Sequence, residues 1–217
     1  MTIRSRLYTA IAVTVAGLAV TSGVGIWSMN RVGDRFDSVE KAADARALAL
    51  QLKFGVTDFN GWQTAYGYDN GRSRPIFLRS VTSFRAELRA ARAVLTRARE
   101  QRLLATIGGA FDAFMRIDAQ AFAALKAGRV HEVRRLFLGP EIDNFELAAA
   151  AAQRLAVLEE SRARAEDSRF RRARHDARRY LIAASVFAAL VVAILLATAV
   201  DLARRAERAL QRGVAGA

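Results

Sequence analysis

Two long apolar stretches, one near each end of the chain, limit what this sequence can fold into. Residues 7–29 and 180–200 contain no Asp, Glu, Lys or Arg. The hydrocarbon core of a bilayer is about 30 Å thick, and about 20 apolar residues in an α-helix are enough to cross it. The sequence therefore predicts two transmembrane helices, 7–29 and 180–200, which enclose a water-facing domain at 30–179.

The basic residues that flank these stretches bear on orientation. Arginines precede the first stretch and follow the second: Arg4, Arg6, Arg204, Arg205, Arg208 and Arg212. Basic residues near a span favour the cytoplasmic side, so we expect 1–6 and 201–217 to be cytoplasmic. The segment 162–179 is more basic still, so a simple count of basic residues on each side of the spans would predict the opposite orientation. However, long translocated domains largely escape that rule. We expect a two-pass protein of the cell (inner or plasma) membrane, with 30–179 outside the cytoplasm.

A secretory signal peptide is the alternative for the first stretch. Its two preceding arginines and the small residues at 21–23 fit such a signal. However, the apolar run continues to Met29, which is longer than a usual signal core, and no A-x-A cleavage site follows. We therefore favour an uncleaved helix. Cleavage would instead leave a secreted helical binding protein.

Composition argues against several classes of function. The net charge of +13 comes almost entirely from Arg, but these residues alternate with acidic ones along predicted helices, so we do not expect nucleic-acid binding. Membrane lipid is the expected partner for the charge that acidic residues leave unbalanced. The chain has no cysteine, its two histidines (His131 and His175) are far apart, and it contains no phosphate-binding glycine loop. We expect no enzyme, no catalytic residue, no metal and no cofactor.

The sequence of 30–179 predicts four helices, and in the first three the apolar residues recur at alternating steps of four and three. The first series is Leu48, Leu52, Gly55, Phe59, Trp62 and Tyr66, carried upstream by Val32, Phe36, Val39 and Ala43. The second is Phe77, Val81, Phe84, Leu88, Ala91 and Leu95, and the third is Leu104, Ile107, Phe111, Phe114, Asp118, Ala121 and Leu125. Breaks are predicted at 69–71, at 97–100, at Gly128 and at 139–140.

These lengths predict an all-α fold. We expect an antiparallel four-helix bundle whose first and fourth helices are continuous with the two transmembrane helices. The second and third helices are shorter, so the turn between them falls short of the membrane and leaves a two-helix stalk. Acidic residues of the first helix (Asp34, Asp37, Glu40 and Asp44) would face the basic end of the fourth across that stalk.

Two phrases resemble a known family. DFNGWQTAYGYDNG (58–71), followed by RPIFLRSVTSFRAELRAARAVL, is similar to the sensor module of bacterial methyl-accepting chemotaxis receptors, particularly actinobacterial ones. FDAFMRIDAQ and LKAGRVHEVRRLFLGPEIDNF resemble the later half of that module, so the resemblance covers about residues 1–200. It implies an extracytoplasmic four-helix-bundle sensor in a homodimer, which relays ligand state to a cytoplasmic signalling rod.

The sequence departs from that family after the second stretch. Family members continue into a HAMP linker and a long signalling coiled coil, whereas here 17 residues follow (201–217). We therefore expect a chemoreceptor-like sensor that is truncated before its output domain. The alternative is a two-span structural or adaptor protein that uses the helical domain to bind another membrane protein.

Five polar residues are candidate ligand contacts: Asn60, Gln63, Arg72, Arg74 and Asp118. Asn60 and Gln63 lie beside the first apolar series, and the two arginines lie near the predicted turn, where they suit an anionic ligand. Asp118 falls within the third series, so it needs either an arginine partner or a polar cavity. For each of them, an ordinary structural role is the competing interpretation. The ligand would be a small molecule, with a protein partner as the alternative.

Overall fold

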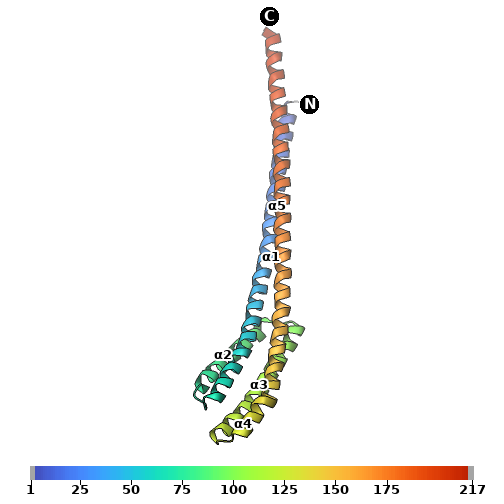
Figure 1. Cartoon of the computed structure of the whole chain (residues 1–217). Coiled ribbons are helices and arrows are strands. Elements are labelled where there is room, and N and C mark those ends of the chain that lie inside the picture. Colours follow the sequence, from blue (N-terminus) through green and yellow to red (C-terminus); the bar gives the residue numbers. More distant parts are fainter. Residues whose placement is uncertain (1–2, 215–217) are drawn as a thin grey trace. The chain divides into compact units, whose positions relative to one another are not determined.

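A computed structural model describes residues 3–214, and it is all-α: 94% is helical and the described part contains no strand. The elements are α1 (Ile3–Tyr68), α2 (Arg74–Val94), α3 (Ala98–Lys126), α4 (Val130–Leu136), the π-helical turn η1 (Phe137–Glu141) and α5 (Ile142–Val214) (Figure 1). The predicted all-α class is confirmed. Of the predicted cytoplasmic ends, residues 1–2 and 215–217 lie outside the described residues, as do the side chains of Arg4, Arg6, Arg205, Arg208 and Arg212.

The first predicted break is confirmed. α1 ends at Tyr68, and Asn70 and Gly71 follow with φ values of 56° and 92°, in the left-handed region that glycine tolerates best. The Asp69 carboxylate then accepts a hydrogen bond from the Ser73 backbone N–H at 3.2 Å. α2 starts at once, with Pro75 in its first turn.

The predicted turn at 97–100 is wrong by about two residues. The chain leaves α2 after Val94 and enters α3 at Ala98. The Glu100 carboxylate accepts a hydrogen bond from the Arg97 backbone N–H at 3.0 Å, which satisfies a donor at the start of α3. Gln101 donates its side-chain amide to the Leu95 carbonyl at 2.6 Å. Glu100 therefore lies in the first turn of α3 rather than at the end of the preceding turn.

The later breaks occur where the sequence places them. α3 ends at Lys126, and Gly128 follows with φ 71°. Between α4 and α5, Gly139 has non-helical angles (φ −119°, ψ −109°) and Pro140 follows it. From Ile142 onward α5 continues as one helix to Val214.

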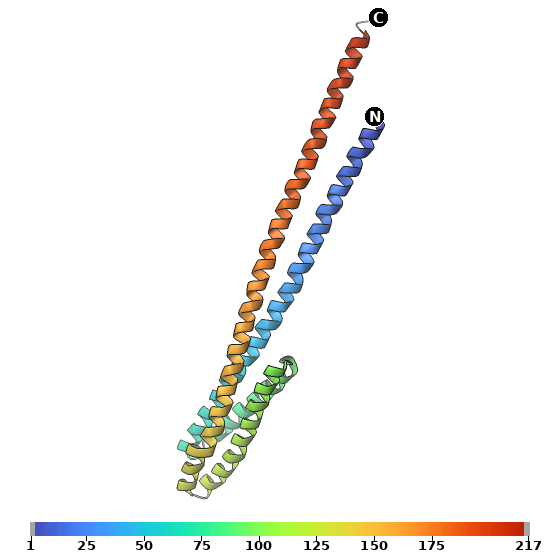
Figure 2. The same cartoon turned by 90° about the vertical axis from the view of Figure 1, so that its right-hand side faces the viewer.

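The chain divides into two compact units: residues 1–37 with 168–217 form unit 1, and residues 38–167 form unit 2. In unit 2, a single hydrophobic core contains side chains from α1, α2, α3 and α5. Figure 1 shows α2 beside the cyan end of α1, and Figure 2 shows α3 (green) beside the yellow start of α5. The centre of this core is aromatic. Phe59 lies 5.0 Å from Phe84, 5.3 Å from Phe111 and 5.0 Å from Phe114, between ring centroids.

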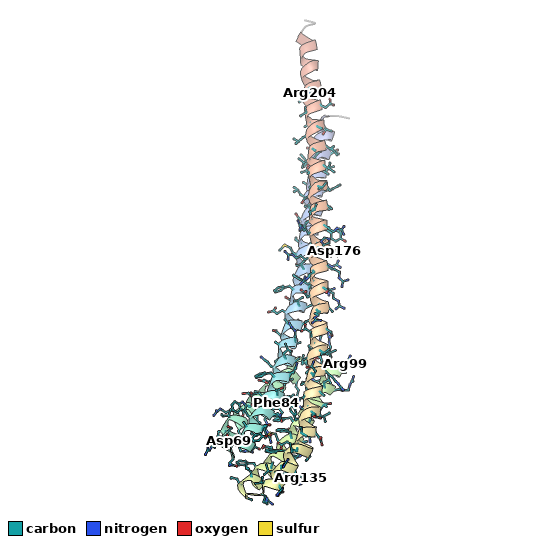
Figure 3. All side chains as sticks on the ribbon, viewed as in Figure 1. Asp69, Phe84, Arg99, Arg135, Asp176 and Arg204 are labelled. Carbon is teal, nitrogen blue, oxygen red and sulfur yellow. The ribbon has the colours of Figure 1, made fainter. Side chains whose placement is uncertain are left out.

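The buried residues of α2 and α3 follow their predicted series closely, and Phe84 of α2 is fully buried (Figure 3). On α1, four residues of the predicted series are buried: Leu52, Gly55, Phe59 and Tyr66. The buried side also includes residues that the prediction left out, namely Ala42, Ala45, Ala49, Val56 and Gln63. Ala43 and Phe36 of the predicted upstream series are instead exposed. Small alanines allow close helix contact as well as large side chains do, and the prediction weighted size too heavily.

In unit 1, segments of α1 and α5 contact each other through aromatic rings. Trp27 and Tyr180 meet at 5.8 Å, and Phe36 and Phe170 at 6.2 Å, both in edge-to-face geometry. Both helices are long and apolar enough to cross a membrane. In their most apolar windows only 6% of the α1 residues and none of the α5 residues are buried, whereas the core helix of a soluble protein would bury most of them. These windows therefore present apolar side chains outward.

Candidate functional site

The first candidate site in unit 2 is a group of four polar residues, Tyr66, Arg74, Asp118 and Glu141, which we call the Arg74 cluster. They come from α1, α2, α3 and η1. The Asp118 carboxylate is fully buried and accepts hydrogen bonds from Arg74 Nη1 at 3.1 Å and Arg74 Nη2 at 2.8 Å. The Tyr66 hydroxyl donates to the same carboxylate. One carboxylate thus joins three helices.

Aromatic rings surround the guanidinium of Arg74. Its Cζ atom lies 3.8 Å from the ring centroid of Phe122, 4.8 Å from that of Tyr66 and 5.4 Å from that of Phe77. Such contacts favour a cation over the ring face. Burial acts to lower the pKa of Arg74, but the hydrogen bonds and charge of Asp118 outweigh it and raise that pKa. The pKa of Tyr66 is raised, first by burial and then by the charge of Asp118. The cluster therefore combines the Arg74–Asp118 ion pair with a neutral tyrosine.

Glu141 is the least satisfied member of the cluster. Its side chain is 2% exposed, and neither carboxylate oxygen has a hydrogen-bond partner in the described part of the chain. Burial raises the pKa of Glu141 to about 9, the charge of Asp118 adds to that rise, and Arg74 opposes it. At neutral pH the Glu141 carboxyl is therefore protonated and can donate a proton or a hydrogen bond.

The local backbone explains how Glu141 comes to be buried. Gly139 and Pro140 interrupt the helix at η1, so the residue after them enters the core instead of continuing the surface of α4. On the opposite side, Gly67 of α1 lets the ring of Phe137 approach closely. A Cβ atom on Gly67 would lie 2.5 Å from Phe137 Cε2.

A second group, Glu100, Glu159 and Arg162, lies at the α2–α3 turn, and we call it the Arg162 cluster. Arg162 Nη1 lies 2.7 Å from Glu100 Oε1 and 3.4 Å from Glu159 Oε2. Both carboxylates are buried, and Glu159 Oε1 has no hydrogen-bond partner within the described residues. Burial raises the pKa of Glu159, and the neighbouring charge of Glu100 raises it further. The cluster also borders a cavity of about 400 Å³ with Lys41, Arg97 and Glu166 in its wall.

The two clusters share a pattern in the sequence, of which the prediction named only Asp118. Glu141, Phe145, Ala148, Ala152, Leu155 and Glu159 follow one another at steps of four and three along the chain. Glu100 likewise precedes Leu104 and Ile107 at this spacing, and Asp118 belongs to the same series. The buried side of α3 therefore carries Glu100 and Asp118, and the series that runs from η1 into α5 carries Glu141 and Glu159. Each cluster contains one acid from α3, one acid from η1 or α5, and one arginine. A search for acids in apolar series would have found all four.

The five predicted contacts are only partly brought together. Arg74 and Asp118 form the buried ion pair described above. Arg72 is exposed and Asn60 is half-buried, with its backbone carbonyl accepting a bond from Thr64. Gln63 was expected beside the apolar series of α1, but it lies on the buried side of that helix and is 4% exposed. Its Nε2 atom has no hydrogen-bond partner in the described part. Trp62, expected in the core, is half-buried against it.

Chemically, these clusters suit ionic switching rather than metal binding. The described residues include no group of three His, Cys, Asp or Glu that could hold a metal ion. Each cluster instead contains an arginine that is ion-paired with one acid, beside a second acid whose pKa is raised. No protein-family model, curated protein or solved structure matches the chain.

Proposed function

We propose that this protein is a two-span membrane sensor of the chemoreceptor type. Residues 38–167 would form an antiparallel four-helix bundle outside the cytoplasm, and a stimulus there would be relayed through the spans. The observation that carries the proposal is that α1 and α5 each contain both an apolar stretch of spanning length and residues of the unit 2 core. Such a helix can transmit a small displacement directly.

The Arg74 cluster is the place in unit 2 where we propose that a stimulus acts. It joins α1, α2 and α3 through the Asp118 carboxylate, and the charges of Asp118 and Arg74 also act on Glu141 of η1. A change in its charge or occupancy would therefore alter contacts made by α1 and the electrostatic environment of the segment that leads into α5. A stimulus shifts the equilibrium between two arrangements only by as much as it binds one of them better. Glu141, with its unpartnered carboxyl, supplies that difference.

A homodimer belongs to the same proposal. Apolar or small residues recur at steps of four and three on the exposed side of α1: Ala43, Ala47, Leu50 and Phe54. Leu50 is 44% exposed and Phe54 is 71% exposed. Apolar residues at this spacing on an exposed helix side suit pairing with a second copy of the same helix.

A fusion to a known output tests the relay. Residues 1–200 are joined to the cytoplasmic signalling region of a kinase-coupled receptor, and kinase activity is compared between the native sequence and Arg74→Met. We expect Arg74→Met to shift the activity, because it breaks the ion pair with Asp118. Adding Arg35→Pro should abolish that shift, since proline interrupts a helix, whereas adding Arg35→Ala should preserve it. Equal activity with and without Arg74→Met would favour the structural or adaptor role.

A further inference from the structure

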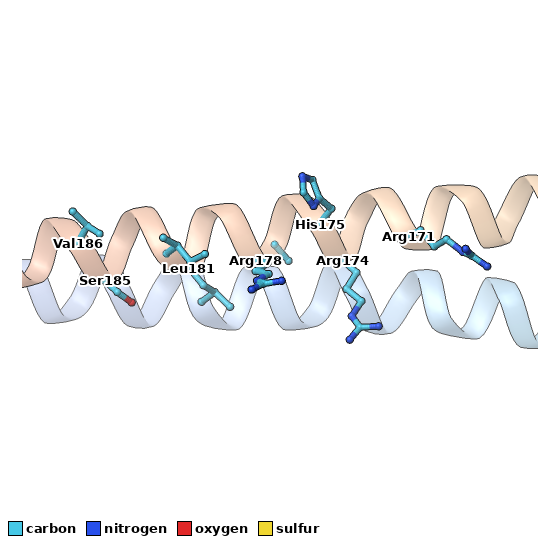
Figure 4. A pocket seen from close by; sticks show the side chains of 9 residues that line it. Arg171, Arg174, His175, Arg178, Leu181, Ser185 and Val186 are labelled. Carbon is cyan, nitrogen blue, oxygen red and sulfur yellow. The ribbon is translucent and has the colours of Figure 1, made fainter.

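A shallow groove of about 780 Å³ lies on one side of α5 in unit 1. Its basic half is formed by Arg171, Arg174, His175 and Arg178, and its apolar half begins at Leu181. Figure 4 shows these side chains in chain order along the α5 ribbon. Because these residues recur at steps of three and four, they share one side of the helix. The groove thus changes from cationic to apolar along its length.

The basic half has donors available for an anion. Arg174 and Arg178 make no ion pair or hydrogen bond with any residue that the structure describes. The nearest acid in sequence, Asp176, lies about 200° around the helix from each of them, at 100° per residue. Two guanidinium groups one turn apart present their N–H donors to the same region, an arrangement that suits a phosphate group.

The apolar half continues directly from the basic one. Leu181, Ile182 and Val186 are 42%, 54% and 55% exposed. They belong to the apolar stretch that we propose crosses the bilayer, so their natural environment is hydrocarbon. An acyl chain lying along these three side chains would extend away from a headgroup held by Arg174 and Arg178.

Aromatic residues mark the boundary between the two halves. Tyr180 lies in sequence between Arg178 and Leu181, and its ring contacts Trp27 at 5.8 Å. Arg31 Cζ lies 5.2 Å from the Trp27 ring centroid. Tyr and Trp are enriched where the hydrocarbon core meets the headgroups. The basic half therefore lies at headgroup level and the apolar half at acyl-chain level.

We propose that this groove binds an anionic phospholipid, with the phosphate held by Arg174 and Arg178 and an acyl chain along Leu181, Ile182 and Val186. The inference rests on the proposed membrane insertion but not on the sensor role. Charge complementarity selects an anionic lipid over a zwitterionic one, since a single basic residue near an anionic membrane surface contributes about 1 kcal/mol, or about fivefold in affinity.

The test uses the full chain purified in detergent, with lipid binding measured by native mass spectrometry. We expect the native chain to bind phosphatidylglycerol at least tenfold more tightly than phosphatidylcholine. The double variant Arg174→Gln, Arg178→Gln should lose this preference. Glycerol phosphate alone should not displace the lipid, because it lacks the acyl chain; displacement would show a free-phosphate site and overturn the lipid assignment.

The matched control is Arg172→Gln, Arg179→Gln. These residues lie at the same level of α5 but on a different side of the helix, and the groove does not include them. The control should keep most of the preference. Equal loss in both double variants would mean general surface attraction and would overturn the proposal, as would a native chain without preference. Protease protection in phosphatidylcholine vesicles is measured in parallel. It separates failure of the lipid proposal from failure of the chain to insert into a membrane.

Discussion

At the scale of single residues, the molecule is distinguished by buried acids inside an otherwise apolar core. Asp118 is paired with Arg74, whereas Glu141 has no partner for its carboxyl among the described residues. Glu159 is in an intermediate position, with one oxygen near Arg162 and the other unpartnered. A buried acid without a partner is stable only when protonated. These residues therefore link the stability of unit 2 to pH.

The first prediction concerns that link at Glu141. Its pKa is raised in the folded state to about 9 from an ordinary value of 4.5. The contribution of protonated Glu141 to the free energy of unfolding is therefore complete below pH 4.5. It is lost as pH rises toward 9, with a slope of up to about 1.4 kcal/mol per pH unit. In Glu141→Gln the free energy of unfolding should fall less steeply over this range, as measured by urea denaturation at several pH values.

The control for that measurement is Glu146→Gln, which alters an exposed acid on α5. Its pH profile should follow that of the native chain. Raised pKa values at Glu159 and Glu87 leave a residual slope in the same direction in every variant. An unchanged profile in Glu141→Gln would contradict the burial of an unpaired carboxyl at this position.

The second prediction concerns the ion pair. Arg74→Met removes the cation and leaves Asp118 buried beside Tyr66, so we expect a loss of about 3–5 kcal/mol in the free energy of unfolding. Arg74→Met combined with Asp118→Leu should recover most of that loss, because no charge is then left unpaired. Thermal and urea unfolding followed by circular dichroism measures both. Additive losses in the double variant would show that the two residues do not act as a pair.

At the scale of helices, the close approach between α1 and η1 leaves little room for change at Gly67. Gly67→Ala improves intrinsic helix propensity by about 1 kcal/mol. However, the new Cβ would lie 2.5 Å from the Phe137 ring, which also packs against Tyr66 at 6.1 Å. We expect a net loss of stability of about 1–3 kcal/mol from this overpacking.

A smaller partner at residue 137 should reverse that effect. Phe137→Leu alone leaves a small cavity, whereas with Gly67→Ala it makes room for the methyl group. The double variant should therefore be more stable than the sum of the two single changes predicts, by at least about 0.5 kcal/mol. Gly61→Ala, where a Cβ meets nothing within 4 Å, should stabilise α1. If Gly67→Ala also stabilises, the close contact is contradicted.

The helices themselves were largely predictable, and the clusters were not. The helix ends at Tyr68 and Lys126 and the kink at Gly139 have local causes, namely residues that favour turns, and local causes are visible in the sequence. The position of Gln63 was misjudged because large side chains drew the first series toward Trp62, while alanines define the buried side of α1. The meeting of Asp118 with Arg74 and Glu141 depends on contacts between distant segments, which no spacing along one helix specifies.

At the scale of the whole molecule, we propose that two copies pair along α1. The chain has no cysteine, so single cysteines can be introduced cleanly. Under mild oxidation in membranes, Phe54→Cys should form an intermolecular disulfide efficiently. Arg89→Cys, at an exposed position of α2, should do so much less. Equal yields from the two variants would contradict pairing along the Ala43–Phe54 series.

The relay itself is tested most directly by a distance measurement in unit 1. Spin labels are attached at Met29→Cys and Arg179→Cys in the full chain in lipid nanodiscs, and their separation is measured by pulsed electron resonance. The account predicts that Arg74→Met shifts this separation by about 1–2 Å, the scale of helix displacements in signalling proteins. Adding Arg35→Pro should remove the shift, whereas adding Arg35→Ala should not. A separation that does not change when the Arg74–Asp118 pair is broken would contradict coupling between the clusters and the spans.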